Sequence, residues 1–95
     1  MKRLIVTYYC KEGMREEFLN ALMQEGVYEG SNHDKGCLQY EYFSSAKEKD
    51  VLVLLERWES EELLQAHLQT PHIAKMPKLK EQYVKDSTIE KFDVE

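Results

Sequence analysis

Apolar and polar positions divide the first part of the chain into two elements. Residues 3–10, RLIVTYYC, are rich in β-branched and aromatic side chains, and the polar KEG that follows ends the run. A run of this kind, closed by a glycine turn, predicts a strand. Beyond it, apolar residues recur at helical spacing with polar residues between them, which predicts an amphipathic helix of about four turns. The apolar positions of that helix are Met14, Phe18, Leu19, Leu22 and Met23.

The middle of the chain has the pattern of a β-hairpin. The segment 30–36, GSNHDKG, has the composition of a loop, and the alternating CLQYEYF at 37–43 predicts a second strand. The polar SSAKEKD at 44–50 is typical of a turn, and VLVLLERW at 51–58 is the strongest strand pattern in the sequence. Two strands joined by a short polar segment predict a hairpin.

The remainder predicts segmented helices and a final strand. Ser60 is a good N-cap, and the two glutamates after it favour the positive end of a helix that runs to about residue 69. The Thr-Pro step that follows is suited to starting a new helical segment, and Pro77 predicts a further break. The final STIEKFDV, at 87–94, predicts a weaker strand whose polar residues suit a sheet edge.

These elements follow the order strand, helix, strand, strand, helix, strand. With no internal repeat or linker, residues 1–95 are expected to form a single domain. The order is that of a ferredoxin-like α+β fold, in which helices cover one face of a four-stranded antiparallel sheet.

The sheet predicted by this order has apolar residues on both faces. Strand 51–58 carries Val53 and Leu55 on one face and Leu52 and Leu54 on the other, and strand 3–10 repeats the pattern. Helices can cover only one face of such a sheet, and an apolar face of several hundred Å² is rarely left in water. We therefore expect a homodimer in which a second copy covers the other face.

Composition excludes several classes of partner. The net charge of −5 and the interleaving of lysines with glutamates argue against a nucleic-acid partner, which requires a basic stripe. No apolar run approaches the length of a membrane span, and no signal peptide is recognisable, so we expect a cytoplasmic protein without a membrane partner. Cys10 and Cys37 are too isolated for a C-x-x-C pair and are expected to be reduced thiols.

The histidines do not predict a metal site. His67 and His72 are separated by five positions with a proline between them, whereas ligands on one helix need a separation of three or four. No Cys or Asp near them in the sequence completes a ligand set, so no metal is expected. The serines lack the G-x-S-x-G motif of a nucleophile, and no glycine-rich phosphate loop is present.

Glu56, Trp58 and His67 are the residues that could carry chemistry. Glu56 and Trp58 have the same strand parity, and His67 lies two turns into the helix that follows. If they project onto the helix-covered face, an acid, an indole and an imidazole converge in one interior space. A purely structural role for all three remains the alternative. Tyr8 and Tyr40, on strands, could line a pocket for an aromatic substrate.

The residues from Glu56 to His72 read E-x-W-x-S-x-x-x-L-x-x-H-x-x-T-P-H. This pattern resembles that of the antibiotic biosynthesis monooxygenase domain of the dimeric α+β barrel superfamily. The segment GCLQYEYF, at 36–43, extends the resemblance to the second strand, so that it covers nearly the whole chain. The resemblance implies homodimers of packed ferredoxin-like sheets and a pocket between sheet and helices.

The resemblance also implies an activity. Relatives oxidise quinols or phenols with O2 and use no metal, flavin or haem, so no cofactor is expected. His67 would be the base or proton relay, Glu56 its orienter or acid partner, and Trp58 a wall of the pocket. Tyr8, Tyr40 and His72 complete the expected substrate site, although the position of His72 at the start of a helical segment also gives it a capping or packing role.

Other branches of the superfamily remain as alternatives. Haem-degrading members have a histidine ligand at the position of Pro77 and an asparagine on the first strand, and neither is present here. Phospho-autoinducer-2 isomerase-like enzymes share the H-x-x-T-P-H run and would use the same His and Glu, but the sequence has no clear phosphate-binding cluster, although Lys35 and Lys75 could contribute to one. A dimeric ligand-binding or stress-associated module without turnover is the non-enzymatic alternative.

Overall fold

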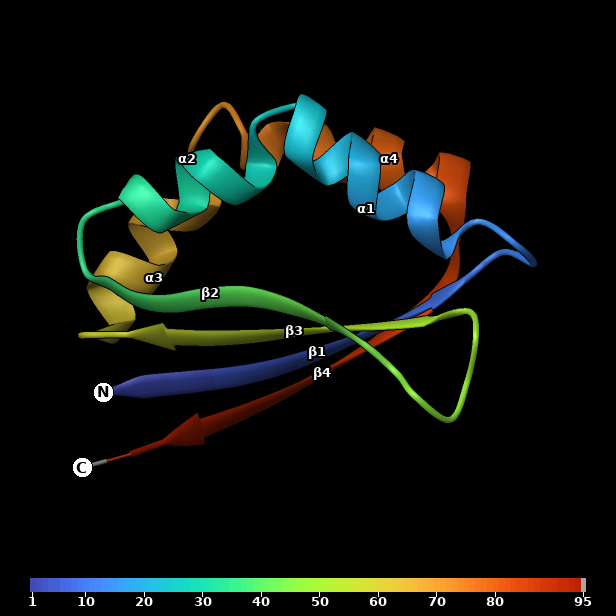
Figure 1. The fold of residues 1–95 in the computed structure, drawn as a ribbon. Helices are drawn as coiled ribbons and strands as arrows, with labels where there is room; N and C mark the ends of the chain where they lie inside the picture. Colours follow the sequence, from blue (N-terminus) through green and yellow to red (C-terminus); the bar gives the residue numbers. More distant parts are fainter. Residues whose placement is uncertain (95) are drawn as a thin grey trace.

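The computed structural model describes residues 1–94, which form one four-stranded sheet and its helices (Figure 1). The sheet order is β2-β3-β1-β4, and all neighbouring strands are antiparallel. None of the helices within these residues is long and apolar enough to cross a membrane. The elements are β1 (Lys2–Cys10), α1 (Arg15–Gln24), α2 (Val27–His33), β2 (Cys37–Ser44), β3 (Val51–Trp58), α3 (Glu61–Leu68), a 3₁₀ turn (Ile73–Lys75), α4 (Met76–Tyr83) and β4 (Val84–Asp93).

The architecture is ferredoxin-like α+β, as the sequence predicts. All the helices lie on one side of the sheet in Figure 1, and the core fills the space between the two layers. Alternation along each strand decides which side chains enter that space, because successive residues point to opposite faces. The inward residues include Leu4, Val6, Tyr8, Leu52, Leu54 and Trp58, which pack with Phe18, Leu22, Leu64 and Leu79 of the helices.

The segment between α1 and β2 differs from the prediction. The first helix ends at Gln24, because Gly26 adopts φ 78° and breaks the helical path. A further helix, α2, then includes residues 30–33 of the segment 30–36 that was expected to form a loop, whereas residues 34–36 are not helical. Its composition of Gly, Ser and Asn is typical of a loop, but Val27 and Ser31 are fully buried, so packing overrides propensity here.

Two residues of the helical segments act differently from the expectation. Thr70 lies between α3 and the 3₁₀ turn, where its hydroxyl donates to the carbonyl oxygen of His67 at 2.7 Å and does not cap the next segment, although its carbonyl oxygen accepts from the N–H of Ala74 at 3.1 Å. Pro77 occupies the first turn of α4, where its missing N–H is not needed, so it begins a helix where a break was predicted. Ser60 caps α3 as predicted and accepts a hydrogen bond from the backbone N–H of Leu63 at 3.2 Å.

The face of the sheet that the helices leave open is partly apolar. Val53 and Leu55 of β3 and Ile5 of β1 are half-buried on this face. Phe43 and Phe92, on the outer strands, are 44% and 45% exposed. The two apolar faces predicted from the sequence are therefore present, and one of them is open in the single chain.

Candidate functional site

A cavity of about 330 Å³ lies between the sheet and the helices α3 and α4. All four strands contribute to its wall, and most of the wall is aliphatic. Its polar lining comes from Tyr8 and Tyr40, from Glu56 and His67, and from a small group on α3, α4 and β4. A mainly apolar cavity with a few convergent polar groups is the usual form of a small-molecule site.

Four of the six residues expected at the site line this cavity. Tyr8, Tyr40, Glu56 and His67 are in its wall. The strand residues reach it because they share the inward parity, as predicted for Glu56 and Trp58. Trp58, which is fully buried, and His72 are not part of the lining.

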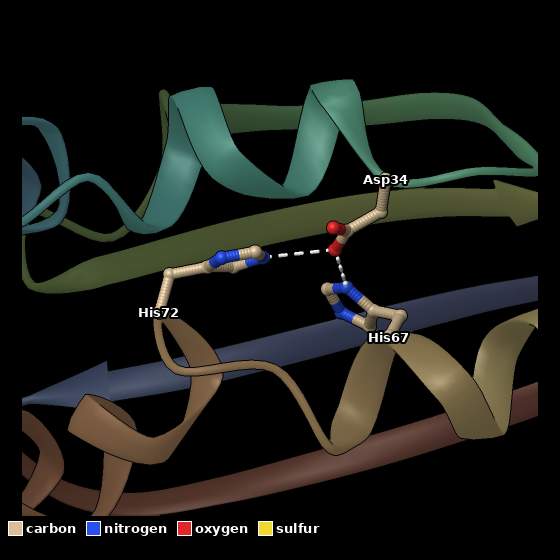
Figure 2. A group of neighbouring side chains, drawn as sticks. All are labelled: Asp34, His67 and His72. Atoms are coloured by element: carbon tan, nitrogen blue, oxygen red, sulfur yellow. Dashed lines mark hydrogen bonds and ion pairs between the residues drawn. The ribbon is translucent and has the colours of Figure 1, made fainter.

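His67 is held by a residue that the sequence did not indicate. Its Nδ1 lies 2.7 Å from Oδ2 of Asp34, the residue directly after α2 (Figure 2). The Nε2 of His72 lies 2.8 Å from the same oxygen, so one carboxylate joins two imidazoles. No Asp near the two histidines in the sequence was expected to join them, and the fold instead brings in Asp34 from 33 positions away from His67.

The Asp34 carboxylate determines which nitrogen of His67 carries the proton. An ionised carboxylate can only accept, so the Nδ1–H of His67 donates to it. Nε2 is then the nitrogen with a free lone pair. Its nearest acid is Oε1 of Glu56 at 3.9 Å, which is too long for a hydrogen bond. Glu56 was expected to orient His67, but Asp34 makes that contact.

Trp58 contacts both Glu56 and His67. Its Nε1–H donates to Oε1 of Glu56 at 3.0 Å. Its ring packs against the imidazole of His67, with centroids 4.3 Å apart and a tilt of 35°. Trp58 therefore fixes the acid and the imidazole, whereas it was expected to form a wall of the pocket.

Burial shifts the pKa values of the polar side chains that line the cavity. Burial raises the pKa of Glu56, and the hydrogen bond from Trp58 only partly opposes this. Burial also lowers the pKa of His67 below 6.5, although Asp34 acts in the opposite direction. Burial raises the pKa of Tyr40 to about 12 and raises that of Tyr8 as well. At neutral pH the cavity thus presents a neutral imidazole and two neutral phenols, which can donate hydrogen bonds.

Asp34, His67 and His72 are also the residues that could hold a cation. One ligand atom from each lies within 4.8 Å of the others, and two imidazoles with a carboxylate suit several transition metals. Binding would require both nitrogens that face Asp34 to lose their protons. The present distances of 2.7 and 2.8 Å are those of two N–H···O hydrogen bonds, so the two imidazoles and the carboxylate form a hydrogen-bond network.

Comparisons with known proteins agree with this fold and sequence pattern. A "Putative monooxygenase YcnE" of Bacillus subtilis (strain 168) is 32% identical over 62 residues, which cover 65% of this chain and 63% of that protein. The chain therefore matches less than two thirds of this curated relative. A Nitrosomonas europaea structure described as a putative antibiotic biosynthesis monooxygenase has a TM-score of 0.88 at 20% identity, covering 99% of this chain and 98% of that one.

A second solved structure is more similar in sequence. It is a conserved protein from Bacteroides thetaiotaomicron VPI-5482, described as a possible oxidoreductase, with 29% identity and a TM-score of 0.85 over 98% of this chain and 96% of that one. The sequence profile of the antibiotic biosynthesis monooxygenase family matches residues 1–78, most of the chain. The chain is therefore a member of the antibiotic biosynthesis monooxygenase family.

Proposed function

We propose that the protein is a cofactor-independent monooxygenase that oxidises a quinol or small phenol with O2. The observation that carries the proposal is the Asp34–His67 pair, which presents a neutral Nε2 at the wall of a largely apolar cavity. This is the arrangement that a base needs in order to take a proton from a phenol near neutral pH.

The reaction starts with proton transfer from the substrate to Nε2 of His67. Ground-state O2 is a triplet and reacts slowly with closed-shell molecules, so the ring must first become electron-rich. The phenolate formed by deprotonation then supplies the four electrons that reduce O2. One oxygen atom enters the ring as the oxygen of a new hydroxyl group and the other leaves as water, so that a hydroquinone becomes a hydroxyquinone without an external reductant.

The surrounding residues assist that transfer in separate ways. Asp34 keeps His67 in one tautomer and stabilises the imidazolium that forms when Nε2 takes the proton. The neutral hydroxyls of Tyr8 and Tyr40 can donate to substrate oxygens as negative charge develops on them. Glu56, with its raised pKa, can return a proton to the departing oxygen. The aliphatic wall limits the entry of water.

The isomerase alternative receives no support from the lysines expected to bind phosphate. Lys75 lies outside the cavity, and its ammonium donates to the carbonyl oxygen of Glu25 at 2.7 Å. Lys35 does not line the cavity either. The same His67 and Glu56 could still transfer a proton between carbons, so turnover must decide between the two chemistries.

Oxygen uptake by chelator-treated protein tests the proposal. We expect a panel of hydroquinones to consume O2 faster than in buffer, and ¹⁸O2 to place one labelled atom in the quinone product. Hydrogen peroxide without label in the product would indicate a simple oxidase. No excess uptake across the panel would contradict the proposal and leave the isomerase and the non-catalytic binding module.

A further inference from the structure

The cavity has two chemically different ends. Glu56 pairs across β1 with Leu4, and Leu4 pairs with Lys91 of β4, so these three residues form one row of the sheet at the acid end. Ser87 lies four positions earlier on β4, roughly 13 Å away at the usual rise per residue. Lys80 lies about one helical turn before the end of α4, and β4 follows directly. Because Lys80 and Ser87 both line the cavity, we place Lys80 at the end of the cavity that contains Ser87.

The two lysines of the cavity wall differ in their partners. Lys91 forms an ion pair with Glu61, with Nζ and Oε1 2.5 Å apart. Within residues 1–94, no carboxylate oxygen lies within 4.0 Å of the Nζ of Lys80. Lys80 is half-buried and lines the cavity, so the positive charge of its side chain can attract an anion bound there.

We propose that the cavity selects a substrate with an anionic substituent, namely a dihydroxylated aromatic ring that carries a carboxylate, and that Lys80 binds this carboxylate. The opposite end holds the Glu56 carboxyl and His67, which accepts a proton from a hydroxyl. The ammonium of Lys80 and the imidazole of His67 therefore orient the ring, with its carboxylate toward Lys80 and a hydroxyl toward His67. This inference extends the proposed function by naming its substrate class.

Binding measured without oxygen separates this inference from the proposed reaction. Anaerobic calorimetry would compare three probes: hydroquinone, 2,5-dihydroxybenzoate and the neutral methyl ester of that acid. We expect the acid to bind roughly threefold to tenfold more tightly than the ester, with the preference falling at high salt. Failure of oxygen uptake with this preference intact would refute the oxygenase and leave the anion site standing.

Lys80→Met tests the anchor, and Lys78→Met is its matched control. Methionine keeps the apolar stem and removes the charge at Lys80, whereas Lys78 is an exposed lysine of the same helix that does not line the cavity. We expect Lys80→Met to bind acid and ester equally, and Lys78→Met to retain the preference. If circular dichroism shows that Lys80→Met is unfolded, Lys80→Gln replaces it.

Three results would overturn the inference. One is equal binding of acid and ester by the parent protein. Another is an acid preference that survives in both Lys80 variants. The last is an equal loss in Lys78→Met and Lys80→Met, which would assign the preference to net charge and not to the cavity.

Discussion

At the scale of single residues, the site depends on one carboxylate shared by two histidines. Asp34 accepts from both imidazoles, but only His67 also faces the cavity. The two histidines should therefore differ in what their removal changes. His67 provides a proton acceptor, whereas His72 mainly holds Asp34 in place.

Alanine substitutions separate these roles. We expect His67→Ala to keep the fold and to lose ~10²-fold or more in turnover, because the proton acceptor is gone. His72→Ala should reduce the free energy of unfolding by about 1–2 kcal/mol through the lost hydrogen bond, with a smaller effect on turnover. Steady-state oxygen uptake and urea unfolding of both variants provide the comparison. Parent-like turnover in His67→Ala would return this histidine to a structural role.

Asp34→Asn tests positioning without removing the base. The amide is nearly the same size, but it carries no charge to stabilise the imidazolium. Turnover should fall substantially while the KM stays close to that of the parent, and the pKa of His67 should fall further because the counter-charge is lost. A pH profile of turnover that is unchanged in Asp34→Asn would contradict the positioning role.

The pH dependence of the parent follows from the lowered pKa of His67. Protonated imidazole cannot accept a proton, so kcat/KM should rise with pH through a value below 6.5 and then level off. The titratable groups around His67 are Asp34 directly after α2, Glu56 from β3, Tyr40 from β2 and the neighbouring His72. A profile that rises only above pH 7 would contradict a base with a lowered pKa.

Protein stability should change in the same pH range. The unfolded chain takes up a proton on this histidine at a higher pH than the folded protein does, because the folded pKa is the lower one. The contribution of His67 to the free energy of unfolding is therefore full above about 6.5 and falls as pH drops toward the folded pKa. Urea unfolding of the parent and of His67→Gln between pH 5 and pH 8 measures the difference.

The sequence could predict part of this residue-level arrangement. Strand parity was sufficient to place Glu56 and Trp58 on one face, and helical position brought His67 over them. Asp34 could not be found in this way, because it lies outside every periodic segment and reaches His67 only through the packing of α2. An Asp in a polar segment has no local signal that distinguishes it from a solvated loop residue.

At the scale of elements, α2 is what positions Asp34. Asn32 of this helix donates to the carbonyl oxygen of Tyr40 at 3.0 Å, which ties α2 to β2. The strands and α3 could be predicted because alternation and a Ser cap are local signals. The helix α2 could not, because its Gly30, Ser31 and Asn32 favour loops and only burial against the core makes the segment helical.

Gly30 is needed for contact between α2 and the segment after α3. A Cβ built at this position would lie 2.6 Å from Nδ1 of His72. We expect Gly30→Ala to displace this imidazole from Asp34 and to lower the free energy of unfolding by roughly 1–3 kcal/mol, although Ala is the better helix former.

The control removes the ring that the new methyl group would meet. In a His72→Ala background, Gly30→Ala should become neutral or should stabilise by up to about 1 kcal/mol, the intrinsic advantage of Ala over Gly in a helix. Urea unfolding of the four proteins in this double-mutant cycle gives the coupling. Equal effects of Gly30→Ala in both backgrounds would show that contact with His72 is not the cause.

At the scale of the whole molecule, the helices leave one partly apolar face of the sheet open. The half-buried Val53 and Leu55 on β3 lie at the middle of this face, with Phe43 on β2 and Phe92 on β4 toward its edges. The face belongs to the central strands of the fold, so a second copy of the same chain can bury it through a two-fold contact. We expect a homodimer for this reason, and the pattern that predicts it is already present in the sequence.

Val53→Lys tests the dimer at the centre of the open face. A lysine there would have to be buried without a counter-ion in a two-fold contact, so we expect the mass in sedimentation to fall from twice 11.3 kDa to 11.3 kDa at micromolar concentration. Gln24→Lys on α1 adds the same charge at an exposed position on the helical side and should remain dimeric. A parent chain that sediments as a stable monomer would contradict the expectation. It would also leave the apolar residues on the open face of β3 uncovered, because helices can cover only one face of this sheet.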